Sequence, residues 1–392
     1  MKIKTLLGGL SAEQFIQHYW QQKPLLIKQA IPGYECPLSA EELAGLALEE
    51  EVESRLVQQQ GEHWSCRYGP FDENDFTSLP ESHWTLLVQG CNRYLPEFAQ
   101  LLELFDFLPA WRLDDIMVSY AADQGSVGPH LDQYDVFLLQ AYGQREWRIA
   151  EGDFSGADYV PNLELKILSN FEAQNNWLLQ PGDMLYLPPG VPHYGIAQGP
   201  CITVSVGFRA ANASQMLNAL CDNLLASQQE QLLELFYRDN IDPTQENALN
   251  QGGLIDENAL HQFRKLLQPL LQRQLQNPAW IAQAVTQTGL APQPLEQSYD
   301  AAELKRQLKA GALLCRDQGS RFAYVKNSQG VLLYANGEPF QLDASQEAML
   351  KLLTGRHFLN HSDIANDVDN ALLLQLLNLG LWYVSEPEED ND

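Results

Sequence analysis

The sequence predicts an α+β protein in which a barrel or sandwich of short strands is followed by a helical segment and then by a smaller mixed segment. Between Trp111 and Phe208, short apolar runs alternate with Gly, Pro, Asn and Asp turns, a spacing typical of all-β sandwiches and barrels. From Ala213 the apolar residues recur at helical spacing. After residue 290, helical and strand patterns are interleaved. These three patterns predict domains at residues 1–210, 211–289 and 290–392.

Two helices are expected before the strands. Ser11, with Gln14 three residues later, forms a capping-box signal for a helix through about Trp20. A second helix is predicted from Ser39 to about Val57. The predicted strands are Asp115–Tyr120, Asp135–Tyr142, Glu146–Ala150, Asn176–Leu179, Met184–Leu187 and Cys201–Phe208.

The helical segment is too small to bury its own apolar stripes. The stripes run from Met216 to Phe236 and along a second helix from about Glu257 to Leu275, with a possible kink at Pro269. Either a partner subunit or the barrel must cover these residues. We expect a homodimer through residues 211–289, with packing on the barrel as the open alternative.

The last segment has a winged-helix-like order of elements. A linker at Leu290–Pro294 precedes a helix, three strands with a turn at Asn336-Gly337, and two more helices; their expected bounds are Ala301–Ala310, Ala312–Arg316, Phe322–Val325, Val331–Tyr334, Ala344–Leu353 and Asn370–Leu379. Residues 370–377 contain no Lys or Arg, so the segment lacks the basic recognition helix of a DNA-binding protein. The acidic tail, Ser385 to Asp392, is expected to be disordered.

Charge and cysteine content limit the partners and the compartment. The net charge of −27 argues against direct nucleic-acid binding and suits a basic partner, although solubility alone is an equal explanation. The six cysteines include no Cys-x-x-Cys pair, which favours a reducing compartment. The N-terminal apolar run is too short for a secretion signal, and no run approaches the length needed to span a bilayer. We therefore expect a cytoplasmic protein without membrane contact.

The motif with the most chemical content is Gly128-Pro129-His130-Leu131-Asp132, followed 61 residues after Asp132 by His193. A strand carrying His-x-Asp places both side chains on one face. His193 follows a Pro-Gly turn, a short apolar strand and the Pro188-Pro189-Gly190 stop, so it can join them from another strand end. Two imidazoles and one carboxylate form the facial triad of non-haem Fe(II) oxygenases. We predict His130, Asp132 and His193 as metal ligands and catalytic residues. The alternative is that His-x-Asp is a surface or helix-capping pattern, as most isolated occurrences are.

The residues from Gly128 to Phe137 resemble the signature of the JmjC-type 2-oxoglutarate oxygenases, and of the bacterial ribosomal oxygenases in particular. Gly143–Arg148, Ser205–Arg209 and Tyr19–Leu25 match the same family. The resemblance is specific over about the first 210 residues and looser, though consistent in layout, beyond them. It implies a double-stranded β-helix (a cupin jelly roll), Fe(II), and 2-oxoglutarate and dioxygen as co-substrates. It also implies hydroxylation of an arginine β-carbon in a large-subunit ribosomal protein (L sixteen).

The distal carboxylate of 2-oxoglutarate would need a cation, and Arg145 is the candidate, since the family uses Lys or Arg at the matching position. Arg145 is expected just after a Gly143-Gln144 turn, at the start of a strand. Arg148 is the rival, but three residues along a flat strand it points to the opposite face. A surface cation beside Glu146 is the alternative for Arg145.

One position departs from the family. The hydroxyl that assists the same carboxylate in ribosomal oxygenases can be a serine, which falls at Ala121 here. Ser119, Tyr120, Thr203 and Ser205 remain open as substitutes.

Asp123 and Tyr142 are the predicted substrate-binding residues. A bound guanidinium needs a carboxylate, which Asp123 could supply, and an aromatic or hydroxyl neighbour, which Tyr142 could supply from the face that it shares with Gln140. An Asx-turn role for Asp123 and ordinary strand packing for Tyr142 are the alternatives.

Three functions remain open on the sequence alone. The first is protein arginine hydroxylation on the translation machinery. The second is hydroxylation of another residue such as histidine, or demethylation of an N-methyl group, by the same iron site. The third is a non-catalytic cupin that binds a ligand or partner.

Overall fold

The computed structural model describes residues 3–385 apart from 153, 155, 162, 241–243, 245–252, 290, 291, 293–297, 328, 329 and 365–370. The chain forms two compact units. The first contains residues 1–210, 294–319 and 355–392, and the second contains residues 211–293 and 320–354. The helices and strands together confirm the predicted α+β class, whereas the division into three domains stays a prediction. The linker at 290–294 lies almost wholly outside the described residues, as does the acidic tail beyond residue 385.

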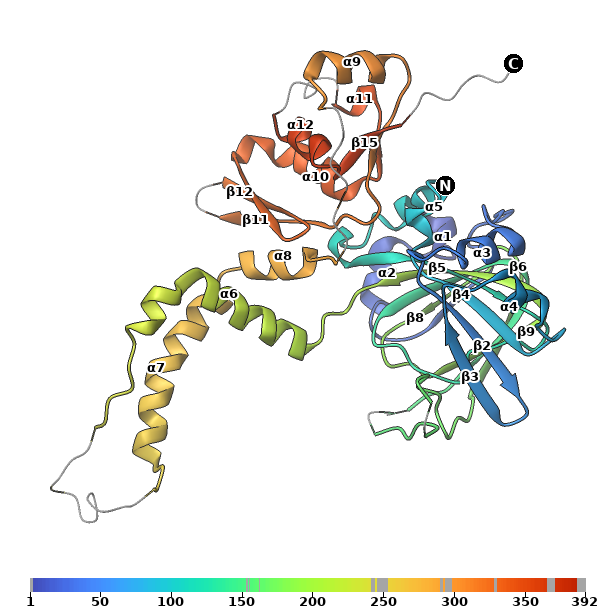
Figure 1. Cartoon of the computed structure of the whole chain (residues 1–392), viewed down its shortest axis with the longest axis horizontal. Coiled ribbons are helices and arrows are strands. Elements are labelled where there is room, and N and C mark those ends of the chain that lie inside the picture. The colour runs from blue at the N-terminus through green and yellow to red at the C-terminus, as the bar shows by residue number, and fades with distance from the viewer. Residues whose placement is uncertain are drawn as a thin grey trace. The chain divides into compact units, whose positions relative to one another are not determined.

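In the described part of the chain, the larger sheet of the first unit contains nine strands of different lengths. Its strand order is β1-β8-β6-β9-β5-β4-β2-β3, with β7 paired to β6, and all of these pairings are antiparallel. Figure 1 shows β2 and β3 as a long hairpin beside β4. The strands are β1 Leu25–Ile27, β2 Ser54–Gln60, β3 His63–Tyr68, β4 Trp84–Val88, β5 Leu113–Ala121, β6 Asp135–Ile149, β7 Asn175–Leu179, β8 Met184–Leu187 and β9 His193–Phe208.

Short helices surround this sheet. The capping box at Ser11 is confirmed, because its side chain accepts a bond from Gln14 N and begins α2. The predicted helix from Ser39 is correct at its start but far too long: α3 ends at Leu46, and the chain then forms β2 from Ser54. The remaining bounds are α1 Ile3–Leu6, α2 Ala12–His18, α3 Ala40–Leu46, α4 Glu73–Thr77 and α5 Glu97–Leu102, with 3₁₀ turns η1 Cys91–Arg93, η2 Glu103–Phe105 and η3 Ala110–Arg112.

Two strands are much longer than predicted. The expected turn at Gly143-Gln144 is wrong, because β6 runs through it without a break and pairs with β9 along both of its halves. Register shifts between Gln140 and Tyr142 and between Tyr142 and Gln144 mark bulges at this point, and Gly143 there has a φ of 63°. The turn-forming glycine therefore bends a strand instead of ending it. In the same way β9 begins at His193, eight residues before the predicted Cys201.

The sheet encloses an aromatic core on one side. Phe15 and Trp20 from the N-terminal helix region pack against Phe137 and Tyr186, with ring centroids 5.0–6.4 Å apart. Asp135, which is fully buried, accepts bonds from Tyr186 and from other donors of this region. This packing ties the first helices to β6 and β8, and thereby fixes the strands that carry the site.

The C-terminal segments of the first unit form a smaller layer. Its strands β10 Leu314–Arg316, β14 Phe358–Leu359 and β15 Trp382–Val384 pair in the order β14-β10-β15. Its helices are α9 Ala301–Lys309, α11 His361–Ile364 and α12 Ala371–Asn378. Glu103 Oε1 accepts bonds from the backbone N–H groups of His357 and Phe358, which links this layer to η2.

The second unit combines α-helices with a three-stranded sheet. Its elements are α6 Ala213–Leu233, α7 Glu257–Leu275, α8 Ala279–Thr286, β11 Phe322–Asn327, β12 Gly330–Ala335, β13 Glu338–Leu342, η4 Ala344–Gln346 and α10 Glu347–Gly355, the last of which ends in the first unit. The turn at Asn336-Gly337 is confirmed by positive φ values of 49° and 85°. The predicted bounds of α7 are confirmed, and the helix continues on both sides of Pro269. Among the described residues, no helix is both long and apolar enough to cross a membrane.

Candidate metal centre and its cavity

The structure brings together the three predicted metal ligands. The ligand atoms of His130, Asp132 and His193 all lie within 4.8 Å of one another. Asp132 Oδ2 is 4.0 Å from His130 Nε2 and 3.6 Å from His193 Nε2. A donor set of two imidazoles and one carboxylate on one side of a cation suits a divalent iron-type metal and leaves its other face open.

Backbone carbonyls fix which nitrogen of each histidine faces the centre. Nδ1 of His130 lies 2.9 Å from Gly128 O, and Nδ1 of His193 lies 2.9 Å from Val191 O. A carbonyl oxygen can only accept, so each Nδ1 carries the proton and each Nε2 keeps its lone pair. Burial, reinforced by the neighbouring His130, lowers the pKa of His193 to about 4. Neutral imidazoles with free Nε2 atoms are the form that binds a metal.

The local backbone differs from the predicted His-x-Asp strand. His130 forms an isolated antiparallel bridge with His193, in which each backbone N–H donates to the other residue's carbonyl at 3.0 and 2.8 Å. Asp132 lies in the loop that follows, where its carbonyl accepts a 2.7 Å bond from Gly190 N. The Pro188-Pro189-Gly190 stop therefore helps to hold the carboxylate-bearing loop beside the first residue of β9.

The triad opens into a cavity of about 530 Å³. Side chains from β2, β4, β5, β6 and β9 line it in rows across the sheet, because paired residues on neighbouring strands share a face. One row is Leu87, Ser119 and Thr203, and the next is Met117, Ser205 and Leu138. The cavity is within the usual range for small-molecule sites.

Arg145 is buried in this cavity without an anionic partner among the described residues. The residue is only 3% exposed. The guanidinium lies 5.1 Å from the Trp147 ring and makes only long contacts of 3.4 Å, to Ser119 Oγ, Thr203 Oγ1 and Gly195 O. Its Nε has no hydrogen-bond partner among the described residues, and burial lowers its pKa. A buried guanidinium remains charged and needs an anion.

Arg148 does not share this environment. It pairs with Glu146 on the other face of β6, with Nη2 and Oε2 3.1 Å apart. The predicted division of the two arginines between opposite faces is therefore confirmed, although the strand that carries them is longer than expected.

The hydroxyl groups near Arg145 differ in whether their protons are free. Thr203 donates to Gln140 Oε1 at 3.2 Å and accepts from Arg145. Ser119 accepts from Arg145 at 3.4 Å. Tyr120 stacks on Trp84, with ring centroids 5.4 Å apart, and does not line the cavity. Of the four hydroxyls left open by the sequence, Ser119 and Thr203 thus contact the arginine, and Ser205 lies one row away.

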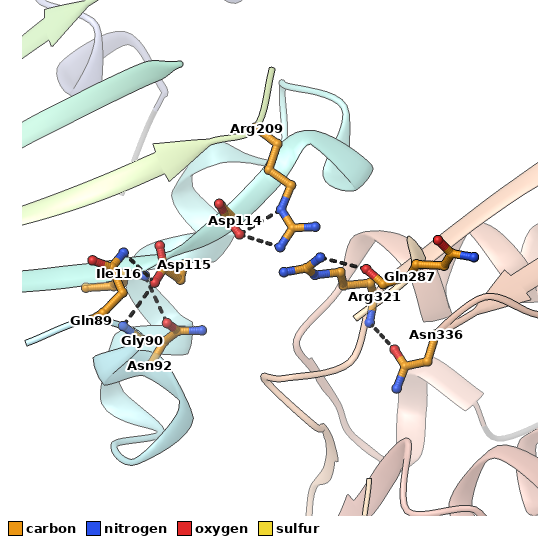
Figure 2. Close-up of polar contacts among 10 residues, drawn as sticks. All are labelled: Gln89, Gly90, Asn92, Asp114, Asp115, Ile116, Arg209, Gln287, Arg321 and Asn336. Carbon is orange, nitrogen blue, oxygen red and sulfur yellow. Dashed lines mark hydrogen bonds and ion pairs between the residues drawn. The ribbon is translucent and has the colours of Figure 1, made fainter. Parts of the chain in front are cut away.

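Asp115 is a buried carboxylate in the cavity wall that the sequence did not single out. Its Oδ2 accepts from Gln89 Nε2 at 2.8 Å and from Gly90 N at 3.0 Å (Figure 2). No bond to Oδ1 is found among the described residues. Burial, with the charge of Asp114 next to it, raises the pKa of Asp115. Figure 2 also shows the neighbouring Asp114 engaged by Arg209, whereas Asp115 is a buried carboxylate of the cavity wall that can receive a cation.

The two predicted substrate residues are not brought to this cavity. Asp123 is exposed, and its Oδ1 accepts a 2.8 Å bond from the backbone N–H of Gly199 in β9. Tyr142 is 58% exposed, whereas Gln140 is fully buried. The bulges in β6 between these two residues break the alternation on which their shared face depended. Neither Asp123 nor Tyr142 is among the residues that line the cavity.

Comparison with known families agrees with this geometry. Residues 100–216 match the JmjC domain family, and residues 271–383 match the ROXA-like winged helix family. The ribosomal protein uL16 3-hydroxylase of Escherichia coli strain K12 is 33% identical over 380 residues, which cover 95% of this chain and 98% of that protein. A probable ribosomal oxygenase of Haemophilus influenzae is 32% identical over 386 residues, covering 95% and 94% of the two chains.

Similarity extends to solved structures. The structure of YcfD, a ribosomal oxygenase from Escherichia coli in complex with cobalt and 2-oxoglutarate, superposes with a TM-score of 0.78 at 33% identity. The match covers 96% of this chain and 98% of that chain.

Proposed function

The chain belongs to the JmjC-domain ribosomal oxygenases, and from that premise we propose that it hydroxylates an arginine side chain of ribosomal protein uL16 at the β-carbon. It is a 2-oxoglutarate-dependent oxygenase that uses iron. The observation that supports this function most strongly is the combination, in one cavity, of the His130, Asp132 and His193 cluster with a buried arginine that has no carboxylate partner in the part of the chain that the structure describes.

The donor set fits Fe(II), and the arginine fits 2-oxoglutarate. His130, Asp132 and His193 would hold Fe(II) through Nε2 and carboxylate oxygen atoms. Arg145 would receive the distal carboxylate of 2-oxoglutarate with its planar fork, and Ser119 would add a hydroxyl. When bound, the iron and 2-oxoglutarate supply the oxidising power: dioxygen, 2-oxoglutarate and a substrate C–H are converted to succinate, carbon dioxide and a C–OH group.

The remaining residues position the substrate and limit water. The apolar side chains of Val136, Leu138 and Met117 line the cavity. The register of the strands places them between Arg145 and Asp115. Such walls strengthen electrostatic contacts and keep bulk water away from the reacting carbon. If the guanidinium of the substrate arginine is held in a fixed position, the β-carbon of that arginine stays in place while its hydrogen is removed.

Asp115 supports arginine as the target residue. Its buried carboxylate lines the cavity, and one of its oxygens makes no hydrogen bond with any residue that the structure describes. An arginine side chain can satisfy this oxygen with a charge-assisted bond, whereas a neutral histidine cannot compensate the negative charge. This contrast favours arginine over the alternative histidine substrate and adds Asp115 as a candidate carboxylate beside Asp123, whose predicted role stays a prediction.

The uL16 3-hydroxylase activity of the Escherichia coli relative supports a basic protein of the large subunit as the partner. A net charge of −27 would speed encounter with such a protein and disfavours direct binding to nucleic acid. Because ribosomal proteins are made and assembled in the cytoplasm, we place the enzyme there.

A homodimer through residues 211–289 is part of the same proposal. The helix α7 exposes an apolar stripe at helical spacing, formed by Leu260, Phe263, Leu267, Leu271 and Leu275, which are 39–61% exposed. A second copy that presents the same stripe would bury it.

The test uses a peptide of uL16 centred on the arginine, incubated with enzyme, Fe(II), 2-oxoglutarate and air. We expect the peptide to gain one oxygen and succinate to form in equal amount, with neither product in His130→Ala. Succinate without peptide modification would retain the oxygenase and refute the uL16 substrate. Absence of both products from a folded, iron-loaded wild-type protein would refute the function.

A further inference from the structure

The hydroxyl of Thr85 is a buried polar group without a partner. Thr85 lies on β4, is 0% exposed and lines the cavity. Its Oγ1 has no hydrogen-bond partner among the residues that the structure describes. A buried hydroxyl normally finds a partner, because leaving it unpaired forfeits its bonds to water. The missing partner must therefore come from the cavity that Thr85 lines.

Cross-strand register places Thr85 next to the arginine region. Thr85 pairs with Ala121 on β5, and Ala121 pairs with Cys201 on β9, so the three side chains share a face. The adjacent row contains Ser119 and Thr203, which are the two hydroxyl contacts of the arginine. Thr85 thus lies one row of side chains away from the residues that contact the guanidinium of Arg145.

Small side chains separate Thr85 from that guanidinium. Ala121, Ala197 and Cys201 form one buried cluster, and Ala197 pairs across the sheet with Arg145. None of these three side chains carries a strong hydrogen-bond donor. A ligand carboxylate that reaches Arg145 therefore meets Thr85 as the hydroxyl on the β4 side.

The number of hydrogen-bond donors available to a carboxylate bound at Arg145 supports a role for the Thr85 hydroxyl. A carboxylate has two oxygens and about four acceptor positions, and the fork of one arginine fills about two of them. The proton of Thr203 is already used on Gln140. Ser119 can provide one more donor, which leaves a position for another hydroxyl.

We propose that Thr85 donates its hydroxyl hydrogen to the distal carboxylate of 2-oxoglutarate held by Arg145, an inference that rests on the proposed function. In this chain Thr85 on β4 thereby supplies the hydroxyl that Ala121, its partner on β5, lacks. The residue acts in co-substrate binding and does not take part in the transfer of oxygen.

The experiment compares Thr85→Val, which keeps the branched shape, with Thr85→Ser, which keeps the hydroxyl. Binding of 2-oxoglutarate to full-length protein loaded with cobalt(II) is measured by calorimetry without oxygen. Loss of a hydrogen bond to a charged group predicts that Thr85→Val weakens binding roughly 10- to 150-fold, and Thr85→Ser less than about 3-fold. The melting temperature of the ligand-free protein is expected to stay the same or rise in Thr85→Val, because an unpaired hydroxyl is removed.

Ser54→Ala is the matched control. Ser54 is also buried and its Oγ also lacks a partner among the described residues, but it does not line the cavity. We expect this change to leave 2-oxoglutarate binding unaltered. Binding by Thr85→Val within about 2-fold of wild type, or an equal loss in Ser54→Ala, would overturn the inference while leaving the proposed function intact. A wild-type protein that takes up cobalt but binds no 2-oxoglutarate would overturn both.

Discussion

Replacing Arg145 by methionine separates two properties that usually fall together, folding stability and ligand affinity. Arg145 is 3% exposed and has no carboxylate partner in the described part of the chain. A methionine of similar length removes a buried charge and leaves no cavity of comparable size. The free energy of unfolding of the ligand-free protein is therefore expected to stay the same or to rise.

The effect on 2-oxoglutarate has the opposite sign. Its distal carboxylate would enter the same buried pocket without a cation, and leaving one member of a buried ion pair alone costs about 3–5 kcal/mol. At about 1.4 kcal/mol per tenfold change, the dissociation constant should rise about 100- to 4,000-fold.

The assay is calorimetric titration of 2-oxoglutarate into cobalt-loaded protein, with thermal unfolding of the ligand-free form measured in parallel. Arg148→Met is the matched control, since Arg148 lies on the same strand, has a side chain 40% exposed and forms a surface pair with Glu146. Such a pair contributes at most about 1 kcal/mol, so neither measurement should change much. A rise of less than 5-fold in the dissociation constant of Arg145→Met would refute the assignment of this residue to the distal carboxylate.

Three further predictions concern the substrate and the assembly. Asp115→Asn should raise the KM for the uL16 peptide about 100-fold, as expected for loss of a charge-assisted bond to a guanidinium, while 2-oxoglutarate binding is unchanged; an unaltered KM would exclude Asp115 from the substrate site. Burial raises the pKa of Asp115, and only its ionised form attracts a guanidinium, so peptide affinity should fall as the pH drops towards that raised pKa. The KM of the wild-type protein for the peptide should therefore rise as the pH is lowered from 8 to 5, and the KM of Asp115→Asn should not; an equal rise in both would contradict this reasoning. Leu267→Asp places a charge in the exposed stripe of α7 and should convert a dimer to a monomer in sedimentation analysis, with Lys265→Asp as the control; a dimer that persists would place the interface elsewhere.

The metal site was predictable because its information is local in the sequence. His130 and Asp132 are two residues apart, and His193 follows a Pro/Gly stop that any fold must turn at. The structure changes the means by which they meet, from a strand to an isolated bridge and a loop, but not the set of three side chains. Ligand identity depended on residue type and spacing, which a change in backbone class did not disturb.

The residues of the cavity wall were not predictable in the same way. Asp115 faces the cavity through the register of β5 with β9, and Thr85 through the register of β4 with β5. Strand β4 itself was not predicted, and pairing between strands cannot be read from the pattern of one strand. The face that Tyr142 was expected to share with Gln140 was wrong for a different reason, because bulges within β6 shifted the alternation that was assumed to be regular; its role in substrate binding stays a prediction.

The measurement that tests the central claim most directly is tandem mass spectrometry of intact uL16 after reaction with the enzyme, Fe(II) and 2-oxoglutarate under ¹⁸O₂. The account predicts one labelled oxygen on the β-carbon of a single arginine, present with wild type and absent with His130→Ala. An oxygen on another residue type, an unlabelled oxygen, or equal labelling by His130→Ala would contradict it.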